Sequence, residues 1–473
     1  MSTLKEQGNE AFKAGDYSQA LRLYTRALLA DPSNAALYSN RAFCYIKLEC
    51  FKAAITDAEK CVSVDPNFTK GFYRQASAHA ALGQLPEAIS ACDKAKKLAP
   101  KDQVICKLLT ALKEKRREQL FMEAIAVEEE NETTNWRDMD ASSAAFKIDD
   151  DKPITPEIAE LAMKKMSEDT EYGKTKLHLK YVLRIIDEVR EILKKRSTIQ
   201  EINTNRRKMT IVGDVHGQFF DLLHLFQVNG IPSENNMYLF NGDYVDRGSF
   251  GVECVLTLFL FMIAFPNSLY LARGNHETKS MNSLYGFEGE VRAKLGEKAY
   301  KAFEEVFTQL PLGHIIDNSI FVVHGGIPPD FVTIKQLKEI KRGGDPVEES
   351  IASALIWADP QSSNGTAQSI RGTGKSFGPD VTANFLDGNN LKYLVRSHEM
   401  KMEGFEWAAQ GRLITVFSAP NYCDAMKNKG AYVHVVYNTT EKDEVPTLKV
   451  ETFVASPHPN IPAMAYATLR GAV

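Results

Sequence analysis

The feature that most constrains this chain is a series of short apolar runs, each of which stops at a polar residue suited to bind a metal ion. The first run, residues 209–212, is followed by Asp214 and His216 in the motif GDVHG. Residues two apart on an extended segment point the same way, so this carboxylate and imidazole can reach one ion. The pattern predicts a buried strand that ends at a metal site.

The same arrangement returns at later strand ends. The polar residues that follow these runs are Asp243 and Asp246 in GDYVDRG, Asn275 and His276 in GNHE, His324 in HGG, and His398 in RSHE. A sixth run, residues 413–417, leads into SAPNY and Tyr422. A single Asp or His after a strand is usually a turn or core residue, but that interpretation fails for five strand ends in succession. Because open α/β sheets place their sites beyond the carboxyl ends of their strands, we expect one shared site.

The proposed metal ligands combine imidazole, carboxylate and amide groups without a thiolate. They are Asp214, His216, Asp243, Asn275, His324 and His398. Such a set suits Mn, Fe or Zn and argues against an Fe–S cluster or a structural zinc site. These ligands are too many for one catalytic metal with an open position, so we expect two divalent ions about 3.5–4 Å apart. Asp243 is the candidate bridge, because it lies in the middle of the ligand order.

The remaining polar residues fit hydrolysis of a phosphoester. His276 directly follows a proposed ligand, so it can protonate the leaving alkoxide, and Asp246 can hold its imidazole in the required tautomer. Arg247 and Arg371 offer planar forks that match phosphate oxygens, and Tyr422 adds a hydroxyl donor. The predicted substrate-binding set is Arg247, Asn275, Arg371 and Tyr422. Arg371 stands alone in a glycine-rich loop, where a solvated surface arginine is the alternative.

The motifs GDVHG, GDYVDRG, GNHE, HGG, RSHE and SAPNY, in this order, resemble those of the metallo-dependent serine/threonine protein phosphatases. The resemblance implies a central β-sandwich flanked by helices, a dinuclear centre of the Mn/Fe type, and activity on phosphoserine and phosphothreonine. It also implies the ligand set above, with His276 as general acid. Two alternatives stay open: a metallophosphoesterase that acts on nucleotides, and a chaperone-binding scaffold without catalysis.

Residues 1 to about 100 repeat with a period of 34 residues. Equivalent positions hold Pro32, Pro66 and Pro100, then Ala20, Ala54 and Ala88, then Tyr17, Phe51 and Leu85. This period is typical of tetratricopeptide helical hairpins, which bury their apolar faces by stacking on one another. We therefore expect an all-α tetratricopeptide superhelix of three repeats and a capping helix over residues 1–130. A linker with a helical segment over 131–174, an α/β metallophosphatase domain over 175–466 and a tail over 467–473 would follow.

Five polar residues of the repeats resemble the two-carboxylate clamp of chaperone-binding tetratricopeptide domains. They are Lys5, Asn9, Asn40, Lys70 and Arg74. Such a clamp holds the terminal carboxylate and an acidic side chain of a peptide. The resemblance implies that the repeats bind the acidic C-terminal peptide of heat-shock protein 90, whereas exposed Lys and Arg residues that serve only solubility are the alternative.

The two predicted domains together resemble phosphatases that carry tetratricopeptide repeats. This resemblance implies that the repeats hold the enzyme inactive until fatty acids or a chaperone peptide release it. Glu49, in KLECF at the turn between two helices, is the candidate for an acidic side chain that occupies the phosphate position. A solvated turn residue is the alternative.

The composition excludes several other classes of protein. The 473 residues are 44% hydrophobic and 25% charged with a net charge of −4, which predicts a soluble protein that does not bind nucleic acid. The seven Cys residues form no CxxC pair, so we expect a reducing compartment, the cytoplasm, with entry into the nucleus left open. The longest apolar run, residues 255–265, is too short for a transmembrane segment. A monomer is expected.

Overall fold

The computed structural model describes residues 3–125, 135–168, 171–371, 374–438 and 445–467. Contacts within the chain divide it into two compact units. The first comprises residues 1–133 with 369–373 and 468–473, and the second comprises residues 134–368 and 374–467.

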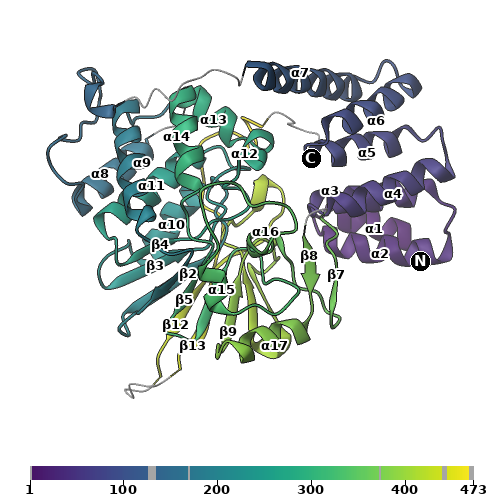
Figure 1. Cartoon of the computed structure of the whole chain (residues 1–473). Helices are drawn as coiled ribbons and strands as arrows, with labels where there is room; N and C mark the ends of the chain where they lie inside the picture. The colour runs from purple at the N-terminus through teal and green to yellow at the C-terminus, as the bar shows by residue number, and fades with distance from the viewer. Residues whose placement is uncertain (1–2, 126–134, 169–170, 372–373, 439–444, 468–473) are drawn as a thin grey trace. The chain divides into compact units, whose positions relative to one another are not determined.

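The described part of the first unit is helical. Its helices are α1 (Leu4–Lys13), α2 (Tyr17–Ala30), α3 (Ala35–Lys47), α4 (Phe51–Val64), α5 (Thr69–Ala81), α6 (Leu85–Leu98) and α7 (Gln103–Ile125). Helices α1 to α6 form successive antiparallel hairpins, which can be followed in Figure 1. The starts of α3 and α5, at Ala35 and Thr69, keep the 34-residue period, so the predicted tetratricopeptide architecture is confirmed.

Small residues allow these helices to pack closely. Ala20, Ala54 and Ala88 are fully buried at equivalent places in α2, α4 and α6. A Cβ atom at Gly8 of α1 would lie 2.7 Å from the Tyr24 ring, so only glycine fits there. Helix α7 packs on α6, as expected for a capping helix, although the predicted helical pattern to residue 130 extends beyond the described residues.

The second unit contains two large sheets and a small hairpin. The strands are β1 (Ile199–Ile202), β2 (Lys208–Val212), β3 (Asn236–Phe240), β4 (Leu269–Leu271), β5 (Gly313–Ile316), β6 (Ile320–Val323), β7 (Thr366–Gln368), β8 (Lys375–Phe377), β9 (Tyr393–Arg396), β10 (Phe405–Ala408), β11 (Leu413–Val416), β12 (Gly430–Val436) and β13 (Thr447–Phe453). One sheet has the order β1-β5-β6-β9-β11-β10 and the other β13-β12-β2-β3-β4, while β7 pairs with β8. Strands β2, β3 and β4 are parallel to one another.

Helices cover the outer faces of the two sheets. The longer helices are α8 (Pro156–Met166), α9 (Leu179–Lys194), α10 (Phe219–Asn229), α11 (Gly251–Ala264), α13 (Phe287–Lys294), α14 (Glu297–Phe307) and α17 (Pro379–Gly388). The shorter ones are η1 (Trp136–Asp138), α12 (Lys279–Tyr285), α15 (Ile334–Lys338), α16 (Ile351–Trp357), η2 (Ala409–Gly411) and η3 (Tyr422–Asp424). Figure 1 shows α8, α9, α11 and α14 on the side of β3 and β4, with α15, α16 and α17 by the other sheet.

The alternation of side chains along each strand explains the layers. Met209 and Ile211 of β2 face the other sheet, where they pack in one cluster with Val322 and Val395. Val212 of β2 belongs instead to the cluster beneath the helices. Because both faces of these strands are buried, the unit is a β-sandwich flanked by helices, which confirms the expected fold class.

The helical layer begins earlier in the chain than the sequence predicts. The sequence predicts a linker with a helical segment over residues 131–174, and α8 is that helix. The rest is not a linker, because Trp136 is buried and Phe146, Ile148 and Ile154 belong to the hydrophobic core of the second unit. These apolar residues are scattered among polar ones in irregular backbone, so they give no periodic pattern. The second unit consequently begins at residue 134 rather than at 175.

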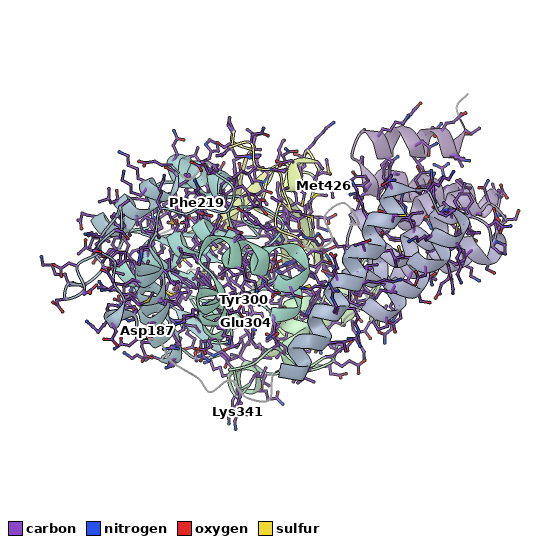
Figure 2. The ribbon with its side chains drawn as sticks, turned by 90° about the horizontal axis from the view of Figure 1, so that it is seen from above. Asp187, Phe219, Tyr300, Glu304, Lys341 and Met426 are labelled. Carbon is purple, nitrogen blue, oxygen red and sulfur yellow. The ribbon has the colours of Figure 1, made fainter. Side chains whose placement is uncertain are left out.

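The same helical layer holds large aromatic residues. Phe219 of α10 and Tyr300 of α14, both labelled in Figure 2, are buried in this layer.

Within the described residues, no helix is both long and apolar enough to cross a membrane.

Candidate metal centre

The polar residues predicted to bind metal converge beyond the strand ends of both sheets. Asp214 follows β2, Asp243 follows β3 and Asn275 follows β4, while His324 and His398 follow β6 and β9 of the other sheet. All five are buried. The site therefore lies where the carboxyl ends of strands from the two sheets meet, as the sequence pattern predicts.

Two groups of these side chains, as found among the described residues, have the spacing of metal ligands. One comprises His216, Asp243 and His276, and the other comprises Asp243, His324 and His398. Oδ2 of Asp243 lies 3.5 Å from Nε2 of His216 and 3.3 Å from Nε2 of His324. Asp243 is thus shared by both groups, the position that a bridging carboxylate would occupy.

Asp214 and Asn275 complete this arrangement. Oδ2 of Asp214 lies 3.8 Å from Nε2 of His216, and Oδ1 of Asn275 lies 2.9 Å from Nε2 of His324. The backbone N–H of His398 donates to Oδ1 of Asp214. All six predicted ligands are therefore brought together. The distances between their donor atoms suit pairs of atoms that would each lie about 2 Å from the same ion.

The electrostatics of these residues fit divalent cations. Burial raises the pKa of Asp214 to about 8, and its Oδ2 accepts no hydrogen bond from any described residue. Burial lowers the pKa of His216 and of His324, which keeps both imidazoles neutral with a lone pair for a metal. A buried carboxylate with one oxygen that accepts no hydrogen bond, beside neutral imidazoles, favours added positive charge, which divalent ions would provide.

Hydrogen bonds hold His276 beside this centre. Its Nδ1 lies 2.8 Å from Oδ2 of Asp246. Asp246 also accepts hydrogen bonds from Nδ2 of Asn282 and from the backbone N–H of Phe287. Burial raises the pKa of Asp246 to about 8, and these donors oppose the shift. The ionised carboxylate is stabilised by these two donors and by the nearby guanidinium of Arg247, which also lowers the pKa of Asp246.

Glu277 was not identified from the sequence, although it is the last residue of GNHE. Its Oε2 accepts hydrogen bonds from the backbone N–H groups of Asp243 and Gly274, and its Oε1 accepts one from Tyr244. A Cβ atom on Gly274 would lie 2.2 Å from Oδ1 of Asp243. Glu277 thus ties the loop after β3 to the loop after β4, and the glycine lets them approach.

A second structural role that the sequence did not reveal belongs to Arg396. Its side chain is fully buried, and it donates to Oδ1 of Asp359, Oε2 of Glu399 and the carbonyl of Gly325. This arginine links RSHE to HGG, the motifs that carry His398 and His324. Asp359, two residues after the end of α16, is its buried ion-pair partner.

Several residues of the centre have left-handed backbone conformations. The φ angles of His216, Asp243, Asp246, Arg247 and His398 lie between 43° and 69°. Such conformations are costly for residues other than glycine and concentrate at functional sites, where the surrounding structure enforces them. The backbone therefore marks the same loops as the side-chain chemistry.

Two of the predicted substrate-binding residues line these loops. Cζ of Arg247 lies 3.8 Å from the centroid of the Tyr285 ring, and the arginine is 3% exposed. The Tyr422 ring lies 5.1 Å from that of His216. The structure thus places the guanidinium and the phenol in the second unit with the proposed ligands.

Arg371 is described with the first unit, because residues 369–373 belong to it by their contacts. The backbone N–H groups of Lys52 and Ala53 donate to the carbonyls of Arg371 and Ile370. Nη1 of Arg371 lies 3.7 Å from Oε2 of Glu49, whose φ of 60° is left-handed. Glu49 therefore faces the arginine that the sequence assigns to phosphate.

The residues of the predicted clamp lie on α1, α3 and α5. Oδ1 of Asn9 accepts hydrogen bonds from Nδ2 of Asn40 and from the hydroxyl of Tyr24. Cζ of Arg74 lies 3.5 Å from the centroid of the Phe43 ring, and burial lowers its pKa to about 10. The exposed lysines of the set are Lys5 and Lys70. The structure brings Asn9 and Asn40 into contact and places the cations on α1 and α5.

Known protein families match both parts of the chain. Residues 207–402 match the calcineurin-like phosphoesterase family. Residues 11–56 and 69–102 match tetratricopeptide repeats, and residues 109–201 match the PPP5 TPR repeat region.

Whole proteins are similar as well. The chain is 41% identical over 470 residues to serine/threonine-protein phosphatase 5 of Homo sapiens, which covers 98% of this chain and 92% of that protein. It is 42% identical to the enzyme of the same name from Arabidopsis thaliana, over 98% of this chain and 96% of that one. A solved phosphatase structure from Saccharomyces cerevisiae, described as similar to human PP5, is 41% identical with a TM-score of 0.58, covering 61% of this chain and 94% of its own.

Proposed function

Because this chain belongs to the serine/threonine-protein phosphatase 5 family, we propose specific catalytic roles for the residues of its metal centre. The chain is a metal-dependent protein phosphatase of the type that hydrolyses phosphoserine and phosphothreonine. The observation that carries the proposed roles is the pair of buried ligand groups that share Asp243.

The centre would hold two divalent ions. We assign as their ligands Asp214, His216, Asp243, Asn275, His324 and His398. Mn and Fe fit this mixed nitrogen and oxygen set, with Zn as the alternative. When bound, the ions would bind phosphoryl oxygens and make hydroxide available near neutral pH. His276 also lies in one of the ligand groups, but the six ligands above already serve two ions, so we assign His276, with Asp246 at its Nδ1, to proton transfer.

The side chains around the ions would perform the remaining chemistry. Nε2 of His276 donates a proton to the serine or threonine oxygen that leaves, and Asp246 stabilises the imidazolium from the other side of the ring. Arg247 and Arg371 bind the non-bridging phosphate oxygens, and the hydroxyl of Tyr422 donates a further hydrogen bond. Each group thereby binds or orients the phosphate, or moves a proton.

One assay distinguishes a protein phosphatase with these residue roles from a nucleotide-specific phosphoesterase and from a non-catalytic scaffold. A phosphoserine peptide, a nucleoside monophosphate and a dinucleoside polyphosphate are compared as substrates of the metal-loaded protein, the chelated protein and His276→Ala. The proposal expects metal-dependent turnover of the peptide above both nucleotides, and a loss of about 10²–10⁴-fold in His276→Ala with the metal content retained. Preferential turnover of nucleotides, or wild-type turnover in the variant, would contradict it.

The first unit would recruit the enzyme to the C-terminal peptide of a chaperone of the heat-shock protein 90 type. The support is the set of polar side chains on α1, α3 and α5, in which Asn9 and Asn40 are in contact and Lys70 lies one turn before Arg74. Amide and cationic donors gathered in this way suit two carboxylates at the end of an acidic peptide.

The first unit would also inhibit catalysis through Glu49. The support is its proximity to Arg371, an arginine assigned to phosphate. While the carboxylate is paired with this guanidinium, Arg371 is not available to a substrate phosphate. The backbone hydrogen bonds from Lys52 and Ala53 hold residues 370 and 371 in the same state. Fatty acids or a chaperone peptide would relieve the inhibition by disturbing the first unit.

Basal activity tests this inhibition. Glu49→Ala should raise the basal rate of the full-length protein, whereas a protein limited to residues 134–467, which lacks the repeats, should already run at the released rate. Glu59→Ala is the matched control, because Glu59 is an exposed glutamate of the next helix. Equal basal rates for the full-length protein, Glu49→Ala and the shortened protein would exclude inhibition by the repeats.

A further inference from the structure

A segment near the end of the second unit connects the two loops that carry Arg247 and Tyr422. This segment, residues 456–467, follows β13 without helix or strand, and we call it the C-terminal strap. On one side, the carboxylate of Asp424, two residues after Tyr422, accepts a hydrogen bond from the backbone N–H of Ala463 and lies 3.0 Å from Nε2 of His458.

The other side of the strap binds the loop of Arg247. The hydroxyl of Ser249 donates to the carbonyl of Pro462 at 2.8 Å and accepts a hydrogen bond from the backbone N–H of Ala465 at 3.2 Å. These two bonds bracket Met464. These hydrogen bonds therefore hold residues 462–465 of the strap against the loop that carries Arg247.

Met464 makes the direct contacts with Arg247. Its backbone N–H donates to the carbonyl of Arg247 at 2.6 Å, and its sulfur lies 4.0 Å from Nη1 of the guanidinium. The φ angle of Met464 is 55°, a conformation that residues other than glycine rarely adopt. The anchors on both sides enforce this conformation, which directs both the N–H and the thioether at Arg247.

Residues after Met464 restrict it further. The hydroxyl of Tyr466 accepts a hydrogen bond from the backbone N–H of Gly173, and its ring stacks on Tyr172 with 4.4 Å between centroids. A Cβ atom at Gly289 would lie 2.6 Å from the carbonyl oxygen of Tyr466, so the strap runs directly against the start of α13. Met464 is thus held at a defined place and cannot move away from Arg247 without breaking these contacts.

We propose that Met464 is a positioning residue, which holds the guanidinium of Arg247 in the orientation that binds the substrate phosphate. Arginine has a long side chain whose ordering opposes binding, and contacts that order it in advance improve affinity. Tyr285 orders the guanidinium through its ring, and Met464 does so through its sulfur and its backbone. The inference rests on the proposed role of Arg247 in phosphate binding, and Met464 itself does not touch substrate.

The test uses the full-length, metal-loaded protein with para-nitrophenyl phosphate as substrate and inorganic phosphate as competitive inhibitor. Met464→Ala should raise KM and the inhibition constant of phosphate by about three- to tenfold, the effect of loosening one charged hydrogen-bond donor, with a smaller change in kcat. Met464→Leu should restore both values only in part, because leucine refills most of the volume but offers no sulfur to Nη1 of Arg247. Met402→Ala, at a methionine that is 40% exposed, is the matched control.

A double-mutant cycle with Arg247→Ala distinguishes positioning from a general structural role. If Met464 acts through Arg247, Met464→Ala should change nothing further in the Arg247→Ala protein. Equal effects of Met464→Ala in both backgrounds would overturn the inference, as would an unchanged phosphate inhibition constant in Met464→Ala alone.

The cycle also separates this inference from the proposed role of Arg247. If Arg247→Ala leaves phosphate inhibition unchanged, the phosphate role of Arg247 fails and the inference falls with it. If Arg247→Ala weakens phosphate but Met464→Ala does not, only the inference fails. Should Met464→Ala not fold, Ser249→Ala removes the two bonds that bracket Met464 and should show the same coupling to Arg247.

Discussion

The substitution Asp246→Asn tests the most specific part of the proposed mechanism, the ion pair behind His276. Asp246 is fully buried and accepts hydrogen bonds from Asn282 and Phe287 besides its contact with His276. Asparagine has nearly the same volume, so it leaves no cavity. It removes the negative charge and replaces one acceptor oxygen with an N–H donor, which disfavours the tautomer of His276 that carries its proton on Nδ1.

The size of the effect follows from the geometry. Two opposite unit charges about 4 Å apart interact by about 4 kcal/mol at an effective dielectric constant of about 20. Loss of this stabilisation from the imidazolium corresponds to about 10³-fold in rate, because each 1.4 kcal/mol is worth about tenfold. Asp246 belongs to neither ligand group among the described residues, so the metal content should remain that of the wild type.

Leaving-group dependence makes the assay specific. Para-nitrophenolate departs without strong help from an acid, whereas the alkoxide of serine requires a proton. Asp246→Asn should therefore lose about 10³-fold in kcat on a phosphoserine peptide and much less on para-nitrophenyl phosphate. His276→Ala should show the same selectivity, and the double variant should be no worse than His276→Ala alone.

Two results would refute this reasoning. Equal losses on both substrates would show that Asp246 does not act through proton donation to the leaving group. A loss of metal in parallel with activity would show that Asp246 supports the ligands instead of His276.

Three further predictions concern other parts of the molecule. Asp243→Asn should fail to bind two metal ions, because a bridge between two cations needs its full charge; dinuclear occupancy by elemental analysis would contradict the assignment. Gly274→Ala should lower the free energy of unfolding in urea by about 1–3 kcal/mol through overpacking against Asp243, whereas Gly344→Ala, where a Cβ meets no atom within 4 Å, should not. Lys70→Ala or Arg74→Ala should weaken the binding of an acidic C-terminal peptide by about 10–100-fold in calorimetry. Amidating the C-terminus of the peptide should weaken its binding to the wild-type protein by a similar factor; unchanged affinity on amidation would exclude the clamp.

The sequence predicted two kinds of feature: the repeated helical hairpins, and the polar residues that follow the strands. The 34-residue period fixed the helical hairpins, since equivalent small residues such as Ala20 and Ala54 recur where helices touch. The ligands were predictable because each follows an apolar run, and strands of a sandwich bring such ends together.

The missing parts depend on contacts between distant residues. Glu277 binds backbone N–H groups at Asp243 and Gly274, and a sequence pattern does not show where a carboxylate will meet backbone donors. The pairing of Asp359 with Arg396 likewise requires two loops that only the folded sheet brings together. The early boundary of the second unit was missed because Phe146 and Ile148 contribute to a core from irregular backbone.

The order of strands in the second sheet has a consequence for how the enzyme is made. Strand β2, which carries Asp214, pairs with β12 at residues 430–436, so the sheet beneath the first ligand is completed only after most of the chain has been synthesised. At about 5–20 residues per second on the ribosome, β2 waits on the order of 10–40 s for this partner. A metal site rarely exists before its fold. The site that would hold the ions is therefore incomplete until β12 has been made and has paired with β2.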